Sequence, residues 1–557
     1  MPHAVTIATP GLQALILCGP GSSFPTFTAN PDENPKALLP IANRPMVWYP
    51  LEFCYRAGIT NITLICPPSA AEAIATALKT NPFLTSLPYP RPDLLSPKDL
   101  DQNTGTAEIL RLPEVQSLVT SDFLLLPCDL VCELGADKLL QAWMVKSASL
   151  ADVLSDSRLH RGPRSGGLGV WYQTKTATPV KGEETDFIGT VALPPSTILA
   201  QKGSLFPHIH NLVYSMPTDS LKDLLDEKTD FKVRRMLINS HPRVRMLTTH
   251  RDAHLYIFPH WVMDFIRDNE RLETIGEDVV GWWAKAGWQK GLPAKLGLDK
   301  ILGHDENDDD REEKSGPGSS PSKSAASSPS KNGEPQTGTA KDKTGDARRG
   351  ESASAEPVVP PMLAYIHPSQ KTTTSAAATA PGPILRRVDT SQLLLQVSLQ
   401  LAKLPSLEET SADAASPFAH ARKVAYPEGV QPRTTITKQD TLVADNVTVQ
   451  EKTSIKESVI GANCQINEGA KLIQCLLMDG VVVGKNCKLT KCILGKRSEI
   501  GEGCVLTDCE VQENMLVERK TEAKDEKFMS SSGLEATEDE FADEASGGDD
   551  DDGDAED

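Results

Sequence analysis

Several features are missing from this chain of 557 residues, and each absence argues against a class of protein. No apolar run approaches the roughly 18 residues of a membrane-spanning helix, and no basic segment precedes the first apolar run as in a signal peptide. The 11 cysteines include no Cys-x-x-Cys pair, which argues against zinc sites and disulfides. A net charge of −19 gives no sign of a nucleic-acid-binding surface. We therefore expect a cytosolic protein that contacts neither membrane nor nucleic acid.

Two stretches have few or none of the residues from which a core is built. Gly303 to Pro357 contains no Leu, Ile, Val, Met or aromatic residue, which predicts a disordered linker over residues 303–357. Glu535 to Asp557 holds 13 acidic residues and no Lys or Arg. Without it the net charge would be about −6, which is ordinary for a protein surface. We expect a disordered acidic tail over residues 521–557, whose simplest role is solvation and whose alternative role is binding a basic segment.

Residues 1–302 alternate short apolar runs with helix-like stretches. Leu12–Cys18, Ile62–Cys66 and Phe123–Pro127 are short and mostly apolar runs, as in strands that are buried on both faces. Met46–Ala57 is a helix candidate between the first two. This order predicts an α/β domain with a doubly wound, mostly parallel sheet.

Residues 358–430 are expected to connect this domain to the C-terminal region. They contain a short apolar run, Met362–Ile366, and then a helical pattern that Asp389 or Thr390 can cap and that Pro405 ends. The helix has an apolar face that consists of Leu393, Val397 and Leu401. We expect it to pack the first domain against the C-terminal region.

Residues 431–520 carry an aliphatic residue at steps of 6, 6 and 5, which adds up to a coil of 17 residues. The series comprises Val443, Val449, Ile455, Ile460, Ile466, Leu472, Leu477, Val483, Leu489, Leu494, Ile500, Leu506 and Val511. Hexapeptide periodicity of this kind is typical of a parallel β-helix with three short faces and one inward aliphatic side chain per face. The sequence predicts a left-handed parallel β-helix, with the cysteines that repeat every 17 residues as small core side chains.

A glycine-rich turn comes after the first apolar run. Gly19 and Gly21 come directly after Cys18, and Pro35-Lys36 follows 14 residues later. A strand that leads into such a loop can bring backbone N–H groups against a phosphate. The segment resembles the signature of the sugar-nucleotide pyrophosphorylases, in which Gly-x-Gly-Thr-Arg-Leu precedes Pro-Lys. Ser23 stands where that family has the arginine that stabilises the pyrophosphate leaving group, and losing such a cation lowers a rate by about 10³ or more.

Two further segments match this family. Gly105-Thr106-Ala107 resembles the loop that lies against the nucleotide base, and Asp129 ends a strand where the family aspartate binds Mg²⁺. The glycine before that aspartate is Cys128 here, and no Glu-Lys-Pro segment for a sugar phosphate is evident. The resemblance implies a vestigial nucleotide site that consists of Gly19, Gly21, Lys36, Gly105, Thr106 and Asp129. It implies no catalytic residue, no resident cofactor and no metal ligand other than Asp129, and it leaves residual binding of a nucleotide with Mg²⁺ open.

A pyrophosphorylase-like domain followed by a β-helix occurs in several families, and four features favour one of them. These are the missing arginine, the segment Pro40–Glu52, the segment Ile275–Val280 with Trp282, and the lack of room after the β-helix for the helical-repeat domain of the epsilon subunit. The chain resembles the gamma-subunit family of eukaryotic translation initiation factor 2B over residues 10–302 and 358–520.

The resemblance implies a non-catalytic subunit of the guanine nucleotide exchange factor for translation initiation factor 2. Such a subunit would pair with the epsilon subunit, assemble with the alpha, beta and delta subunits, and help to dock the GTPase. Two alternatives stay open. One is an active pyrophosphorylase of the mannose-1-phosphate guanylyltransferase kind that uses Lys36 and Asp129, and the other is a nucleotide-sensing subunit without turnover.

Overall fold

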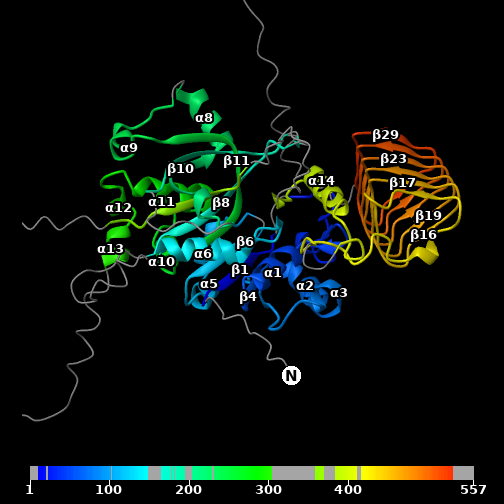
Figure 1. The fold of residues 1–557 in the computed structure, drawn as a ribbon, viewed down its shortest axis with the longest axis horizontal. Coiled ribbons are helices and arrows are strands. Elements are labelled where there is room, and N and C mark those ends of the chain that lie inside the picture. Colours follow the sequence, from blue (N-terminus) through cyan, green and yellow to red (C-terminus); the bar gives the residue numbers. More distant parts are fainter. Residues whose placement is uncertain are drawn as a thin grey trace, which may run out of the picture.

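The computed structural model describes two bodies of the chain that pack against each other (Figure 1). The described residues are 11–19, 23–101, 103–147, 165–176, 179–180, 182–194, 203–228, 231–303, 358–368, 383–410 and 415–530. The predicted linker therefore lies outside the described residues except for residue 303, and so does the part of the predicted tail after residue 530. In the described part of the chain no helix has the length and apolar character needed to cross a membrane.

The first body is built on a nine-stranded sheet with the order β5-β4-β1-β6-β11-β8-β12-β10-β9. The neighbours from β5 to β6 are parallel, as is β8 with β12, whereas the other pairings are antiparallel. The strands are β1 (Gln13–Leu17), β4 (Asn61–Ile65), β5 (Asp93–Leu95), β6 (Phe123–Pro127), β8 (Gly167–Gln173), β9 (Asp186–Ala192), β10 (Ile209–Pro217), β11 (Arg245–Phe258) and β12 (Met362–Ile366). The parallel part contains the three strands that the apolar runs predict.

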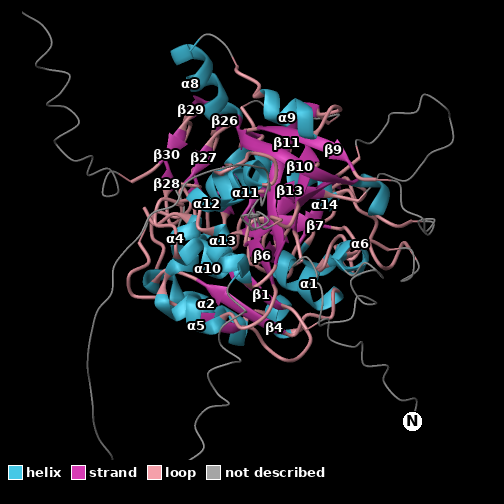
Figure 2. Cartoon of the chain, turned by 90° about the vertical axis from the view of Figure 1, so that its left-hand side faces the viewer, coloured by secondary structure: helices cyan, strands magenta, loops and turns pink. Residues whose placement is uncertain are grey.

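Helices cover both faces of the sheet, which is why β1 is apolar from Ala14 to Leu17. Leu15 packs into one hydrophobic cluster, while Ala14 and Ile16 pack into the other, because successive side chains of a strand point to opposite faces. One cluster includes α1 (Trp48–Arg56), α2 (Pro68–Thr80), α3 (Pro82–Thr85) and α6 (Ala136–Ser147). The other includes α4 (Thr106–Arg111), α5 (Pro113–Leu118), α10 (Trp261–Arg267), α11 (Val280–Ala286), α12 (Leu292–Lys295) and α13 (Leu298–Gly303). Figure 2 shows this arrangement from the side, with α8 (Thr218–Lys228) and α9 (Arg235–Ser240) at one end of the sheet.

One predicted boundary is wrong. The run Met362–Ile366 is not a connection between domains but β12, which lies inside the sheet between β8 and β10. Its pairing is non-local, so no neighbouring segment of the sequence indicates its partners. The next segment, β13 (Leu385–Arg387), pairs with β7 (Leu130–Cys132), which follows β6 directly. The described residues 358–368 and 383–388 therefore belong to the α/β body.

The second body is a three-sided parallel β-helix (Figure 1). Its sheets comprise β14, β17, β20, β23, β26 and β29 on one side, β15, β18, β21, β24, β27 and β30 on the second, and β16, β19, β22, β25 and β28 on the third. The strands are β14 (Thr435–Ile436), β15 (Leu442–Val443), β16 (Thr448–Val449), β17 (Ser454–Lys456), β18 (Val459–Ile460), β19 (Gln465–Ile466), β20 (Lys471–Ile473), β21 (Leu476–Leu477), β22 (Val482–Val483), β23 (Lys488–Thr490), β24 (Ile493–Leu494), β25 (Glu499–Ile500), β26 (Val505–Thr507), β27 (Glu510–Val511), β28 (Leu516–Val517), β29 (Glu522–Lys524) and β30 (Lys527–Phe528). The three parallel sheets fit the predicted left-handed β-helix, but the coils extend to Phe528 rather than ending at residue 520. Each of the 13 aliphatic residues of the series is buried in one interior cluster.

The helix α14 (Ser391–Ala402) lies between the two bodies (Figure 1). The side chain of Thr390 accepts a hydrogen bond of 3.3 Å from the Leu393 backbone N–H, which is the predicted cap. Val397 and Leu401 pack in one cluster with the outward-facing Val459 and Leu476 of the β-helix. The predicted packing role of this helix is confirmed.

Candidate functional site

The crevice at the carboxyl ends of β1 and β6 brings the first candidate residues together, as expected for an open α/β sheet. Gly19 follows β1 with a φ of 101°, a conformation that residues with a Cβ rarely adopt. A Cβ placed there would lie 3.9 Å from Cβ of Lys36, so the glycine turn and the lysine are adjacent. Gly21 lies outside the described residues.

Lys36 and Asp129 form a buried ion pair. The Nζ–Oδ2 distance is 2.8 Å, and the two side chains are 10% and 1% exposed. Lys36 also donates a hydrogen bond of 3.2 Å to the hydroxyl of Ser23, the residue at the position of the family's arginine. The two residues of the vestigial site that correspond to the family's phosphate-binding lysine and metal-binding aspartate are therefore bound to each other.

A second cation faces the same carboxylate. Arg387 Nε lies 3.5 Å from Asp129 Oδ1, an atom that is buried and has no hydrogen-bond partner among the described residues. The Arg387 side chain also lies 3.6 Å from Asp389, which in turn pairs with Arg251. Arg387 is not among the residues predicted from the sequence. The sequence feature that could have indicated it is a pair of arginines in a short segment beside apolar residues. A guanidinium that is largely buried there needs a carboxylate partner.

The charges around Asp129 decide its protonation. Burial alone raises the pKa of a carboxyl group, but here the Lys36 ammonium and the Arg387 guanidinium outweigh burial and lower the pKa of Asp129 to about 2. Lys36 responds in the opposite sense. Burial alone would lower the pKa of this lysine, but the Asp129 carboxylate outweighs burial and raises it. Both groups stay charged across the physiological pH range.

Gly105 and Thr106 bond to a different part of the chain. A Cβ on Gly105 would lie 2.3 Å from the backbone oxygen of Glu273, so only glycine fits this close approach. The Thr106 hydroxyl accepts a hydrogen bond of 3.0 Å from the Ile275 backbone N–H, and Ala107 N–H donates to Glu273 O. These bonds join the Gly-Thr-Ala loop to the start of the π-helical segment Ile275–Val279.

A group of buried acids lies beyond Arg387, and no sequence motif indicated it. The backbone N–H of Asp252 donates to the Asp186 carboxylate, and Tyr256 donates its hydroxyl hydrogen to the Asp252 carboxylate. Between them His254 has a φ of 50°, where β11 shifts register against β8. A non-glycine residue with positive φ at a bulge marks stored backbone strain. Burial raises the pKa of Asp252 and of Asp186, and their mutual proximity raises that of Asp252 further.

The Mg²⁺ that the pyrophosphorylase resemblance implies does not fit this arrangement. One Asp129 oxygen holds the Lys36 ammonium, and the other faces the Arg387 guanidinium. A divalent cation beside Asp129 would be repelled by both positive groups. Among the described residues, no group of three or more His, Cys, Asp or Glu side chains could share a metal ion.

The loop that begins after Ser23 packs on the β-helix. Thr26 donates a hydrogen bond of 2.9 Å to Glu510, Asn30 donates one of 3.1 Å to Glu513, and Lys496 donates one of 2.8 Å to Asn34. The loop between the glycine turn and Lys36 is therefore part of the junction between the two bodies.

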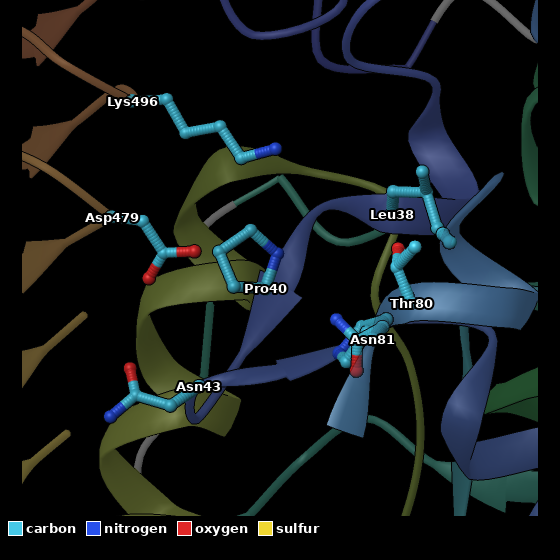
Figure 3. A pocket seen from close by; sticks show the side chains of 9 residues that line it. Leu38, Pro40, Asn43, Thr80, Asn81, Asp479 and Lys496 are labelled. Atoms are coloured by element: carbon cyan, nitrogen blue, oxygen red, sulfur yellow. The ribbon is translucent and has the colours of Figure 1, made fainter. Parts of the chain in front are cut away.

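A cavity of about 180 Å³ lies at this junction (Figure 3). Asp479 and Lys496 of the β-helix face Leu38, Pro40 and Asn43 there, with Thr80 and Asn81 at the end of α2. A larger, more open hollow of about 580 Å³ adjoins it and shares Asp479 and Lys496. None of the described candidate site residues lines either space, so the site around Lys36 and Asp129 and the junction hollow are separate features.

Comparisons with known proteins find relatives of this chain. Residues 425–523 match the family model described as the EIF2B subunit epsilon LbH domain. The chain is 29% identical over 297 residues to the translation initiation factor eIF2B subunit gamma of Schizosaccharomyces pombe, covering 53% of this chain and 56% of that protein. It is 22% identical over 270 residues to the eIF2B subunit gamma of Caenorhabditis elegans, covering 48% of this chain and 57% of that protein. It is 28% identical over 109 residues to the eIF2B subunit epsilon of Schizosaccharomyces pombe, covering 20% and 16%.

These matches bear out the resemblance stated from the sequence. The chain is homologous to curated proteins named eIF2B subunit gamma, and its C-terminal coils match a β-helix domain of the eIF2B epsilon subunit. The chain spans about half the length of the gamma-subunit relatives that it matches.

Proposed function

We propose that the chain acts in translation initiation as a non-catalytic subunit of the guanine nucleotide exchange factor for initiation factor 2. In this proposal it pairs with an epsilon-type subunit, joins the alpha, beta and delta subunits in the cytosol, and helps to dock the GTPase whose GDP is released. The similarity to gamma and epsilon subunits of eIF2B supports the assignment of this chain to that factor.

The observation that carries the non-catalytic part is the ion pair between Lys36 and Asp129. A pyrophosphorylase needs its lysine free to reach phosphate and its aspartate free to hold Mg²⁺. Here the two groups neutralise each other, Ser23 replaces the leaving-group cation, and Arg387 faces the remaining carboxylate oxygen. Such a crevice offers neither the cation for the leaving group nor the ligand for the metal.

The same fold offers surfaces suited to a scaffold. In the described coils, two of the three β-helix sides do not take part in the apolar cluster that joins the bodies, and the coils are stacked by continuous backbone hydrogen bonds. Rigid flat sides of this kind can bind a paralogue that is built on the same plan.

The test is a pull-down of the tagged full chain from the cytosol of its own organism, with mass spectrometry of stoichiometric partners. We expect an epsilon-type paralogue that carries a C-terminal helical domain, together with the alpha, beta and delta subunits. An exchange assay with labelled GDP on purified initiation factor 2 should then show that the epsilon-type subunit releases GDP faster in the presence of this chain than in its absence. This chain alone should release no GDP. Recovery of a homo-oligomer without these partners would contradict the proposal.

Two assays address the alternatives. Incubation with sugar 1-phosphates, nucleoside triphosphates and Mg²⁺ should yield no nucleoside diphosphate sugar, whereas turnover that is lost in Lys36→Ala would establish the pyrophosphorylase. Titration with nucleotides should give no binding. Measurable affinity that is lost in Asp129→Ala would establish the nucleotide-sensing subunit instead.

A further inference from the structure

A short segment, residues 384–389, lies against the crevice at the carboxyl ends of β1 and β6, and we refer to it as the strap. Its strand β13 pairs with β7, the strand that comes after Asp129. At one end Glu133 N–H donates to Ile384 O at 2.8 Å, and at the other Val388 N–H donates to Asp129 O at 2.9 Å. The strap is therefore held by backbone hydrogen bonds to the same chain segment that carries the candidate metal ligand.

The strap brings cations into the crevice. Arg387 faces Asp129 at 3.5 Å, and its neighbour Arg386 lies 3.6 Å from Glu183 and stacks 5.2 Å from the ring centre of Tyr172. Asp389 ends the strap in an ion pair with the buried Arg251 of β11. The guanidinium of Arg387 thus lies between the carboxylates of Asp129 and Asp389.

The strap leads without interruption into the helix between the two bodies. Thr390 caps α14, and Ser398 on that helix accepts a hydrogen bond of 3.2 Å from Ala42 N–H of the α/β body. At the other end of α14, Lys423 donates to the carbonyl oxygens of Ala402 and Leu404. Lys423 lies on the segment that enters the first coil, next to Val424, which bridges to Val443. A single path of contacts therefore runs from Asp129 to the β-helix.

We propose that Arg387 is a cation supplied by the chain in place of the divalent metal, and that the crevice thereby anchors α14 and the β-helix to the α/β body. An enzyme crevice must open to admit its substrate, whereas a joint must stay closed. A guanidinium that is fixed in a strand meets the second requirement, because it neutralises Asp129 without an ion that can leave. Arg387 is a positioning residue in this proposal. The inference does not depend on the exchange-factor function.

The test uses the full-length protein in three forms, which are the wild type, Arg387→Gln and Arg387→Lys. Hydrogen exchange measured by mass spectrometry reports protection of the strap and of α14 separately from that of the coils. We expect exchange in residues 384–402 of Arg387→Gln to speed up by about tenfold or more. The coils that contain β20 and β23 should keep wild-type rates. Arg387→Lys retains the charge and should recover most of the protection.

Arg267→Gln is the matched control, because Arg267 is 55% exposed and forms its ion pairs with neighbours on and beside its own helix. Its exchange pattern should equal that of the wild type. Unchanged exchange in residues 384–402 of Arg387→Gln would overturn the proposal, as would an equal rise in every coil. If Arg387→Gln fails to fold, Asp389→Asn is measured instead and should speed up exchange in the same residues.

The replacement of the metal is tested with Mn²⁺ as a paramagnetic probe of divalent sites. The wild type should show no Mn²⁺ binding that depends on Asp129. Binding by the wild type that disappears in Asp129→Asn would overturn the proposal, whatever the exchange data show.

Discussion

Arg44 donates a hydrogen bond of 2.8 Å to the carbonyl oxygen of Phe418, across the boundary between the α/β body and the segment that leads into the β-helix. A second bond of 2.9 Å goes to Ala419 O, and the guanidinium stacks 4.3 Å from the ring centre of Trp48. The Arg44 residue is only 7% exposed. One side chain thus satisfies two carbonyl groups at the junction and fills the space beside an aromatic ring.

Replacing this residue tests how strongly the junction contributes to stability. Arg44→Met keeps most of the stem but leaves two carbonyl oxygens without their donor, and a buried polar group left unsatisfied costs about 1–3 kcal/mol. We expect a loss of about 2–4 kcal/mol in the free energy of unfolding, measured with urea. Arg267→Met, on the exposed side of α10, should change it by less than about 0.5 kcal/mol. Equal values for the two variants would contradict the junction role.

A double-mutant cycle tests the ion pair in the crevice. Removing one partner of a buried pair leaves an uncompensated charge, so Lys36→Met and Asp129→Asn should each destabilise by about 3 kcal/mol. The double variant should lose less than the sum by about 1 kcal/mol or more, because neither charge then remains. Additive losses would show that the two groups do not interact in solution.

Since the folded-state pKa of Asp129 is lowered to about 2, the contribution of its carboxylate to stability is present above the unfolded-state pKa and should disappear only as the pH falls towards 2.

Asp252 should make stability depend on pH in the opposite direction. Burial and the nearby Asp186 carboxylate raise the pKa of Asp252 from 3.8 to about 7. The stability due to its protonated form is complete below pH 3.8 and is lost as the pH rises towards 7, because the folded state then holds a proton that the unfolded state releases. The melting temperature of Asp252→Asn should therefore fall less between pH 4 and 7 than that of the wild type. Asp268→Asn, an exposed carboxylate, serves as the control, and parallel profiles for the wild type and Asp252→Asn would contradict the buried-acid interpretation.

The local periodicities of the sequence predicted most of the fold. The step of 6, 6 and 5 placed 13 inward residues of the coils, and the apolar runs placed β1, β4 and β6, because both patterns follow from burial within one short segment. A second column, which the predictions did not include, consists of Leu442, Val459, Leu476 and Ile493, each next to an inward residue and spaced by 17. These side chains point outward and belong to the cluster that includes α14. The second aliphatic residue at each of these positions indicated which side of the β-helix packs on the α/β body.

The candidate site was predicted less completely, since its state depends on contacts between distant segments. The motifs located Gly19, Lys36 and Asp129 at one edge of the sheet. They could not show that Arg387, on a strand 258 positions after Asp129, would face that carboxylate. The Gly-Thr-Ala loop was likewise identified from its residue types alone, whereas its hydrogen-bond partners are the backbone groups of residues 273–275. Long-range pairing of β12 and β13 decides both the strand order and the closure of the crevice.

Two adjacent residues of β20 (Lys471–Ile473) test the inward and outward positions of the β-helix directly. Leu472 is fully buried in the interior cluster, whereas the side chain of Ile473 points outward and is 42% exposed. Leu472→Ala should lower the free energy of unfolding by about 2–5 kcal/mol, because it removes buried methyl groups and leaves a cavity. Ile473→Ala removes a similar volume from the surface and should change it by less than about 0.5 kcal/mol. Urea unfolding followed by circular dichroism gives both values. A larger loss for Ile473→Ala would mean that the register of this coil is shifted by one residue, since such a shift moves every side chain of a strand to the opposite face.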